Sequence, residues 1–237
     1  MAGLTYATYK TALSTLSVVP ETDQNWLSIL PDAIEYAELR LYRDLDLLST
    51  VSANTSFSTA ANASKVSLTQ GTFVTLQNVN VITPSGTSNP DLGTRVPLLP
   101  VSKEYIQYSW PSATNAGVPQ YFAMIDERTF SLGPWPDSAY TLEIIGTIRP
   151  ETLSAANTTT FISQYLPDIF LMASMIFISG YQRNFGRQSD DPQMSQSYES
   201  QYNALLKGAT VEEYRKKFAA SAWTSISPSP VATPGRG

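Results

Sequence analysis

The sequence predicts an α+β fold, with a helical bundle body formed by the N- and C-terminal segments, a β-sandwich or barrel-like insertion and an extended C-terminal arm. Apolar residues recur at helical spacing near both ends, and short β-branched and aromatic segments separated by turn residues fill the middle. The last residues are rich in proline. We divide the 237 residues into 1–50 and 161–219 for the helical body, 51–160 for the insertion and 220–237 for the arm.

Two amphipathic helices are expected in the N-terminal segment. The first carries apolar residues at positions i, i+3, i+7 and i+10: Tyr6, Tyr9, Leu13 and Leu16. The second is expected from about residue 31 to 48, with one apolar face: Ile34, Ala37, Leu41, Leu45 and Leu48. Pro31 fits its first turn, where no backbone N–H is needed. Asp23 is expected to cap a short helical turn, which either stands alone or continues into this helix with a bend at Pro31.

The middle segment predicts strands after a loop. Residues 49–64 are small and polar with little to bury, so we expect a loop there. Strands are then expected at 65–68, 72–76, 79–83, 96–100, 120–126, 129–132 and 140–148. Residues 121–125 and 130–132 are expected to form a hairpin, with the strand 140–148 as its neighbour.

The C-terminal segment returns to helical spacing. Residues 161–178 are apolar nearly all round, which is typical of a central core helix. A second helix is expected to follow Pro192 and to end at Gly208, and a third to start with the capping-box pattern of Thr210 and Glu213. We expect the terminal segments to pack together, because the N-terminal helix needs an apolar partner.

Composition excludes several classes of protein. Without cysteine or histidine, the chain lacks disulfides, thiolate metal sites and the commonest general base. The net charge of −5 argues against an outer surface that grips nucleic acid. No secretory signal or membrane span is expected. The carboxylate pairs Asp126–Glu127 and Asp190–Asp191 are interpreted as turn and cap residues. We therefore expect no enzyme, catalytic residue, cofactor or metal.

Three further groups of residues have a structural and a functional interpretation. The basic run Arg215–Lys217 is interpreted as a solvated helix end rather than a nucleic-acid contact. The aromatic residues of the insertion are interpreted as packing, with a sugar- or base-stacking surface as the alternative: Tyr105, Tyr108, Trp110, Tyr121, Phe122, Trp135 and Tyr140. The arm carries Trp223, Ile226 and Val231, which suit docking on a partner, although a disordered end fits its composition equally.

The order of motifs along the chain resembles a known family. Residues 30–45 read LPDAIEYAELRLYRDL, similar to a P-x-x-I-x-x-A-E-x-R-[IL]-x-R-[DE]-L helix. The likeness continues at Pro119–Ala123, Leu132–Pro136, Arg149–Pro150 and Tyr165–Asp168. Over about residues 4–218 the chain resembles the head-to-tail connector, or adaptor, proteins of short-tailed bacteriophages.

The resemblance implies a non-enzymatic homo-oligomeric ring, commonly of about twelve subunits, in the virion neck and assembled in the host cytoplasm. The helical body would dock on the portal protein and form a channel for DNA without sequence-specific binding, and the insertion would face tail or nozzle proteins. The arm would bind the portal through Trp223, Ile226, Pro228, Pro230 and Val231. Ion pairs within a helix or between subunits are expected at Glu38, Arg40, Arg43 and Asp44, with Arg40–Asp44 spaced i, i+4.

The main alternative is a β-rich virion or carbohydrate-binding module on a helical stalk. Trp110, Trp135 and Tyr121 would supply its aromatic binding surface.

Overall fold

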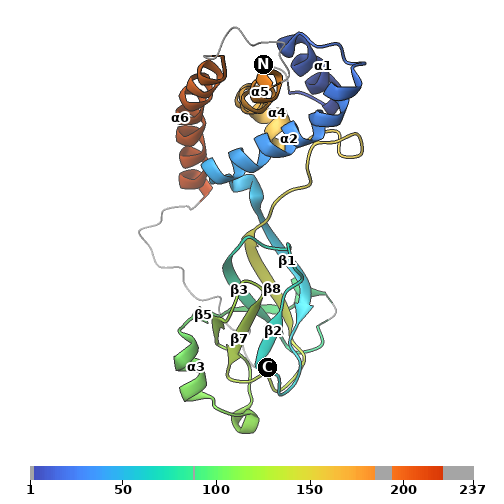
Figure 1. Cartoon of the computed structure of the whole chain (residues 1–237). Coiled ribbons are helices and arrows are strands. Elements are labelled where there is room, and N and C mark those ends of the chain that lie inside the picture. The colour runs from blue at the N-terminus through green and yellow to red at the C-terminus, as the bar shows by residue number, and fades with distance from the viewer. Residues whose placement is uncertain (1–2, 88, 185–193, 221–237) are drawn as a thin grey trace. The chain divides into compact units, whose positions relative to one another are not determined.

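The computed structural model describes residues 3–87, 89–184 and 194–220 (Figure 1). The chain forms two units. The helical unit comprises the described residues up to Leu48 and from Thr152 onward, and the β unit comprises Ser49–Glu151. Helices and two sheets are both present, which confirms the α+β class.

The N-terminal helices begin at well-formed caps. Helix α1 spans Tyr6–Ser17, and the Thr5 hydroxyl accepts a hydrogen bond from the backbone N–H of Thr8. Helix α2 spans Gln24–Asp44, and the Asp23 carboxylate accepts from Asn25 N at 2.9 Å. The Asp23 cap therefore starts one long helix that includes Pro31. Of the two alternatives for the Asp23 turn, its continuation into the helix is confirmed, and a separate start at about residue 31 is wrong. The expected end near 48 is also wrong, since Leu45 already has extended backbone and the turn η1 follows at Leu48–Thr50.

Three helices form the C-terminal part of the helical unit: α4 (Phe161–Tyr165), α5 (Pro167–Asn184) and α6 (Met194–Ala220). Helix α6 continues through Gly208, so the two helices expected there are one. The Thr210 hydroxyl donates to Leu206 O at 2.8 Å within the helix, and the Glu213 side chain accepts from Leu48 N at 3.2 Å. Neither residue forms a capping box, because both lie inside a continuous helix, where Thr210 bonds to the preceding turn and Glu213 bonds to η1.

The two ends of the chain share one core, as the sequence predicts. The ring of Tyr9 in α1 stacks on Phe170 in α5 at 4.4 Å between centroids. The Tyr9 hydroxyl donates to Phe170 O at 3.0 Å and lies 2.7 Å from the Ser174 hydroxyl. Helices α1, α2 and α6 each pack on α5. The fully apolar helix is therefore the centre of the unit, since it has neighbours on several sides.

The β unit contains two four-stranded sheets. The first has the order β1-β8-β3-β4 and the second the order β2-β7-β6-β5. The strands are β1 (Val51–Ser58), β2 (Lys65–Ser67), β3 (Thr75–Thr83), β4 (Thr94–Pro97), β5 (Leu99–Pro100), β6 (Tyr121–Met124), β7 (Thr129–Gly133) and β8 (Thr141–Thr147). Val79, Leu142 and Ile144 from the first sheet share a core with residues of the second, including Phe130 and Leu132. The sheets therefore pack face to face, as in a sandwich.

Several strand expectations are confirmed and others are wrong. The hairpin forms, with β6 antiparallel to β7. Strand β8 pairs with β1 and β3 in the first sheet and not with the hairpin. The strands that flank the hairpin are β2 and β5. Of the expected strand 72–76 only residues 75–76 are in a strand, where they join 79–83 in the single strand β3, and the expected strand 96–100 divides into β4 and β5. Helix α3 (Lys103–Ser109) was not expected.

The stretch expected to be a loop contains a full strand. Strand β1 pairs antiparallel with β8, from Val51 opposite Thr147 to Ser58 opposite Thr141. Its small polar side chains give little sign of a strand, because β1 lies at a sheet edge and buries few side chains. Backbone hydrogen bonds to β8 set its conformation instead.

Candidate functional site

A cluster of charged and aromatic side chains joins the C-terminal half of α2 to α6. Arg40 donates from Nη1 to Glu199 Oε2 at 2.8 Å and from Nη2 to the other oxygen of the same carboxylate. Its Nε lies 3.6 Å from Asp44 Oδ2, and the guanidinium lies 4.3 Å from the centroid of the Tyr202 ring. The Tyr202 hydroxyl donates to Asp44 Oδ2 at 2.7 Å. We call these four residues the α2–α6 network.

The contacts within the network and burial shift the pKa values of Arg40, Glu199 and Tyr202. Hydrogen bonding to Glu199 raises the pKa of Arg40, and the same bond lowers the pKa of Glu199. Burial, followed by the hydrogen bond to Asp44, raises the pKa of Tyr202. A bidentate arginine–carboxylate pair has defined geometry, and the aromatic ring beneath it restricts the arginine further. The arrangement therefore holds two helices in register and has no group suited to proton transfer.

A second polar contact lies where the chain returns to the helical unit. Glu38 in α2 is 2 % exposed, and its Oε1 accepts from the backbone N–H of Leu153 at 3.0 Å. Burial raises the pKa of Glu38 to about 7. Burial also raises the pKa of Tyr9 and of Tyr42, and the nearby Glu38 charge contributes less to both shifts. Glu38 thus anchors the returning segment to α2 through a carboxyl group that titrates near neutrality.

The C-terminal part of α6 holds a third group of charges. Lys216 Nζ lies 2.7 Å from Glu212 and 2.8 Å from the buried Glu213, and 5.3 Å from the centroid of the Phe161 ring. Lys217 forms an ion pair with Asp46. Arg215 is exposed. The interpretation of residues 215–217 as a solvated helix end therefore holds for Arg215 alone, since the two lysines join α6 to neighbouring elements.

The structure brings only some of the predicted site residues together. Arg40 and Asp44 lie within 4 Å of one another on α2, while Glu38 lies on the buried side of that helix and Arg43 is exposed. The predicted arm residues lie outside the described residues: Trp223, Ile226, Pro228, Pro230 and Val231. Sequence reasoning missed Glu199, and it assigned Glu213 to a capping box rather than to contacts with Leu48 and Lys216. For Glu199 the available signal was its spacing of three from Tyr202 on one helical face.

The aromatic residues of the β unit serve mainly in packing. Trp110 stacks on Tyr121 at 5.5 Å, and Tyr105 meets both rings edge-on. The Trp110 ring also covers Gly133, where a Cβ atom would lie 2.6 Å from it. Trp135 Nε1 donates to Trp110 O at 2.9 Å. Rings used in this way attach α3 to the second sheet, in agreement with the packing interpretation.

Other aromatic residues of this set lie elsewhere. Phe122 and Tyr140 belong to the core of the β unit, whereas Tyr108 is 90 % exposed.

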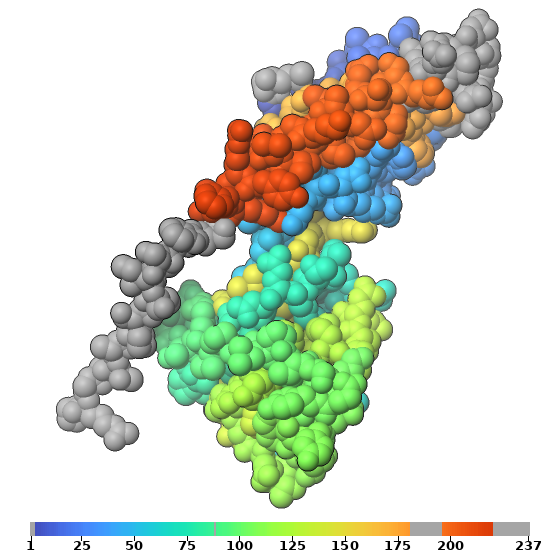
Figure 2. Space-filling view, turned by 90° about the vertical axis from the view of Figure 1, so that its left-hand side faces the viewer, coloured from blue at the N-terminus to red at the C-terminus, as the bar shows by residue number. Residues whose placement is uncertain are grey.

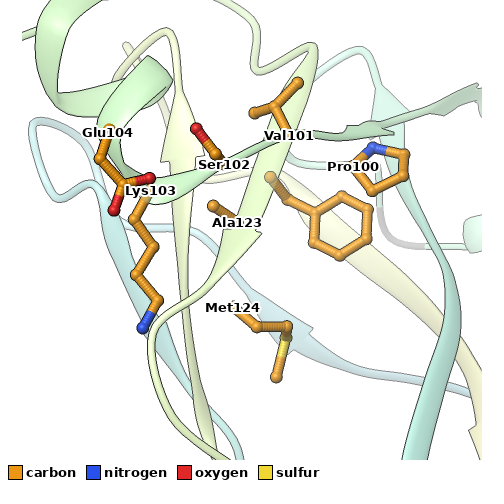
Figure 3. Close-up of a pocket in the computed structure, with 8 residues that line it drawn as sticks. Pro100, Val101, Ser102, Lys103, Glu104, Ala123 and Met124 are labelled. Carbon is orange, nitrogen blue, oxygen red and sulfur yellow. The ribbon is translucent and has the colours of Figure 1, made fainter.

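A cavity of about 420 Å³ lies between the end of β5, the start of α3 and strand β6. Figure 3 shows Lys103 and Glu104 on one side of it and Pro100 and Val101 on the other. Ser102 accepts from Tyr105 N at 3.2 Å, and Lys103 donates to Ile125 O at 2.8 Å. These polar groups are therefore engaged in local structure rather than directed at a ligand.

The described residues contain no cluster of three or more histidine, cysteine, aspartate or glutamate residues able to hold a metal ion. Within the same residues no helix has both the length and the apolar character needed to cross a bilayer.

The comparison with protein families decides the classification. The sequence model of the SU10 adaptor protein family matches residues 4–228, nearly the whole chain. The chain belongs to the SU10 adaptor protein family. No curated protein sequence matches it. The family assignment confirms the resemblance to phage head-to-tail adaptors and identifies a structural adaptor of a phage particle. Such a role agrees with a site made of helix-to-helix contacts.

Proposed function

We propose that this SU10-family adaptor forms a ring beneath the portal protein, extends the DNA channel and provides the attachment platform for tail components. The observation that carries the proposal is the family match over residues 4–228. The two-unit architecture supports it, because one unit can serve contacts with the portal and neighbouring subunits while the other serves the tail.

The helical unit is proposed to form the ring. The α2–α6 network and the Glu38–Leu153 bond hold helices from both ends of the chain in one arrangement, which a repeated subunit contact requires. Arg43, exposed beside this network, is proposed to contact a neighbouring subunit. With a net charge of −5 per chain, a ring would be strongly acidic, so its channel would repel passing DNA and bind no particular sequence.

The proposed partners are the portal protein, tail or nozzle proteins and further copies of the chain, commonly about twelve in a ring. The arm 220–237 is proposed to bind portal subunits, with Trp223 and Ile226 as buried anchors. The β unit is proposed to face the tail. The location is the neck of the virion, after assembly in the host cytoplasm.

Light scattering tests this function directly. The mass of the purified chain is measured alone and after mixing with the portal protein of the same phage. We expect a complex with about twelve copies per portal ring, and its loss when residues 220–237 are deleted. Absence of any complex with the portal would exclude the adaptor proposal, whereas a complex that survives the deletion would exclude only the role of the arm.

A further inference from the structure

Val18 has a conformation and an exposure that the isolated chain does not explain. It caps the C-terminus of α1 in the left-handed region, with φ 54° and ψ 36°, and its side chain is 84 % exposed. Glycine or asparagine normally occupies such a position, because a β-branched side chain crowds the backbone there. Neither the backbone nor burial within this chain favours valine, so its apolar side chain is available for contact with another molecule.

The outer face of α1 beside Val18 presents few unsatisfied polar groups. The hydroxyls of Thr11 and Thr15 donate back to Ala7 O at 3.1 Å and Thr11 O at 2.9 Å, so both threonines satisfy their donors within the helix. Leu16 on the same helix is 41 % exposed. Burying this face against another surface would therefore break few hydrogen bonds with water.

Helix α6 carries a second exposed apolar surface. Val211, Tyr214 and Phe218 are spaced at i, i+3 and i+7 and are 49 %, 69 % and 75 % exposed. Within the helical unit, α1 and α6 lie on opposite sides of α5 (Figure 1). Figure 2 shows α6 lying along the surface. Helix α5 lies between the two helices, so the two surfaces are not packed on each other within one chain.

The charges around the two surfaces are complementary. Residues 3–35, which include α1 and the start of α2, contain one lysine and four carboxylates. Residues 203–219 of α6 contain four basic residues and two glutamates, and Lys216 and Lys217 are already ion-paired within the chain. The complementary charges are therefore the exposed Lys207 and Arg215 on α6 and the exposed Asp32 and Glu35 on α2. A contact between the first region of one copy and the second region of another would bring opposite charges together.

We propose that α1 of one copy docks on α6 of the next, with Val18 and Leu16 packing against Val211 and Tyr214. This inference rests on the proposed ring. Each copy contributes α1 to the contact with one neighbour and α6 to the contact with the other neighbour, so the contact is heterologous. Repetition of such a contact closes into a ring when the rotation between copies allows it.

Cysteine cross-linking tests the contact, because the chain has no cysteine of its own. Two single variants, Val18→Cys and Tyr214→Cys, are mixed, assembled with the portal protein of the same phage and oxidised. We expect a disulfide-linked dimer that contains one copy of each variant. A mixture of Val18→Cys with Tyr108→Cys is the control, since Tyr108 is exposed in the β unit, and it should give no dimer.

Paired substitutions test the head-to-tail character of the contact. Val18→Asp and Tyr214→Asp should each reduce association between copies at least tenfold. A mixture of the two retains one intact junction, between α1 of the Tyr214→Asp copy and α6 of the Val18→Asp copy. We expect mixed dimers in sedimentation and no larger ring. An equal loss of association in the mixture would overturn the proposal.

The variant Val18→Gly separates docking from folding. Glycine relieves the left-handed backbone, so the melting temperature of the isolated chain should stay equal or rise, while association between copies falls at least tenfold. Unchanged association in Val18→Gly, or a portal complex that gives no Val18→Cys–Tyr214→Cys dimer, would overturn this contact and leave the adaptor function standing. Failure of the unmodified chain to bind the portal would instead refute the proposed function.

Discussion

The two units place their buried polar groups differently. In the helical unit such groups lie within the apolar core: Glu38 bonds to Leu153 N, and the Tyr9 hydroxyl bonds to α5. In the β unit the core between the sheets is apolar, and the buried polar pair Asn80–Glu143 lies on the opposite face of the first sheet. Arg95 closes over that pair, with Nε 3.0 Å from Glu143.

This difference indicates how each unit selects a single folded arrangement. Tyr9 and Ser174 are 165 residues apart in sequence, and their contact requires one arrangement of α1 on α5. The β unit relies on alternation, in which neighbouring residues such as Leu142 and Glu143 point to opposite faces. The helical unit should therefore be the more sensitive to single substitutions in its interior, because buried polar groups tolerate few alternative partners.

The largest expected effect concerns the centre of the helical core. Phe170→Ala removes a fully buried ring and the surface on which Tyr9 stacks. We therefore expect the free energy of unfolding to fall by about 3–5 kcal/mol. Denaturant unfolding followed by circular dichroism measures it. Tyr108→Ala, at an exposed position, is the control and should change stability by less than about 0.5 kcal/mol. Similar losses in both variants would contradict the assigned core.

The second prediction concerns pH. The pKa of Glu38 rises from its ordinary value of 4.5 to about 7 on folding, so the native state binds this proton more tightly. The free energy of unfolding should therefore fall by about 3 kcal/mol as pH rises from about 4.5 to about 7, and it should then level off. Glu38→Gln should lose this part of the pH dependence. Glu35→Gln, at an exposed position of the same helix, should retain most of it, because the Glu35 charge makes the smallest contribution to the raised pKa of Glu38. Equal profiles for all three proteins would refute the assignment.

The third prediction concerns the β unit. Gly133→Ala would place a Cβ atom 2.6 Å from the Trp110 ring, so the ring must move and α3 must loosen. We expect a loss of about 2 kcal/mol and a change in tryptophan fluorescence. At Gly117 an added Cβ atom would have no neighbour within 4 Å among the described residues. Gly117→Ala should therefore change neither the stability nor the tryptophan fluorescence. An unchanged spectrum in Gly133→Ala would show that Trp110 does not cover this glycine.

The smallest predicted effect concerns the α2–α6 network. Lysine cannot reproduce the bidentate bond of Arg40 to Glu199, so Arg40→Lys should reduce stability by about 1 kcal/mol. Arg43→Lys is the matched control on the same helix. A double-mutant cycle with Glu199→Gln should show coupling for Arg40 and none for Arg43. Coupling of equal size at both positions would argue against a specific network.

Local patterns determined much of the fold in advance. The spacing of Tyr6, Tyr9 and Leu13 predicts α1, and Asp23 supplies the cap at which α2 begins. The turn residues between β6 and β7 predict their hairpin. These features follow from the sequence because neighbours within a few residues decide helical faces, caps and tight turns. The family motifs are likewise short stretches of consecutive residues, so the adaptor resemblance was also visible in the sequence alone.

Tertiary contacts decided the remainder. Strand β1 forms from small polar residues because β8 offers hydrogen bonds to its backbone, and α6 passes Gly208 because its flanks are packed and bonded to α2 and its neighbours. Arg40 and Asp44 were evident on one helix, yet their partners Glu199 and Tyr202 lie more than 150 residues away. Spacing along a chain reports local geometry only, whereas the packing of distant elements selects the partner of an edge strand or a charged side chain.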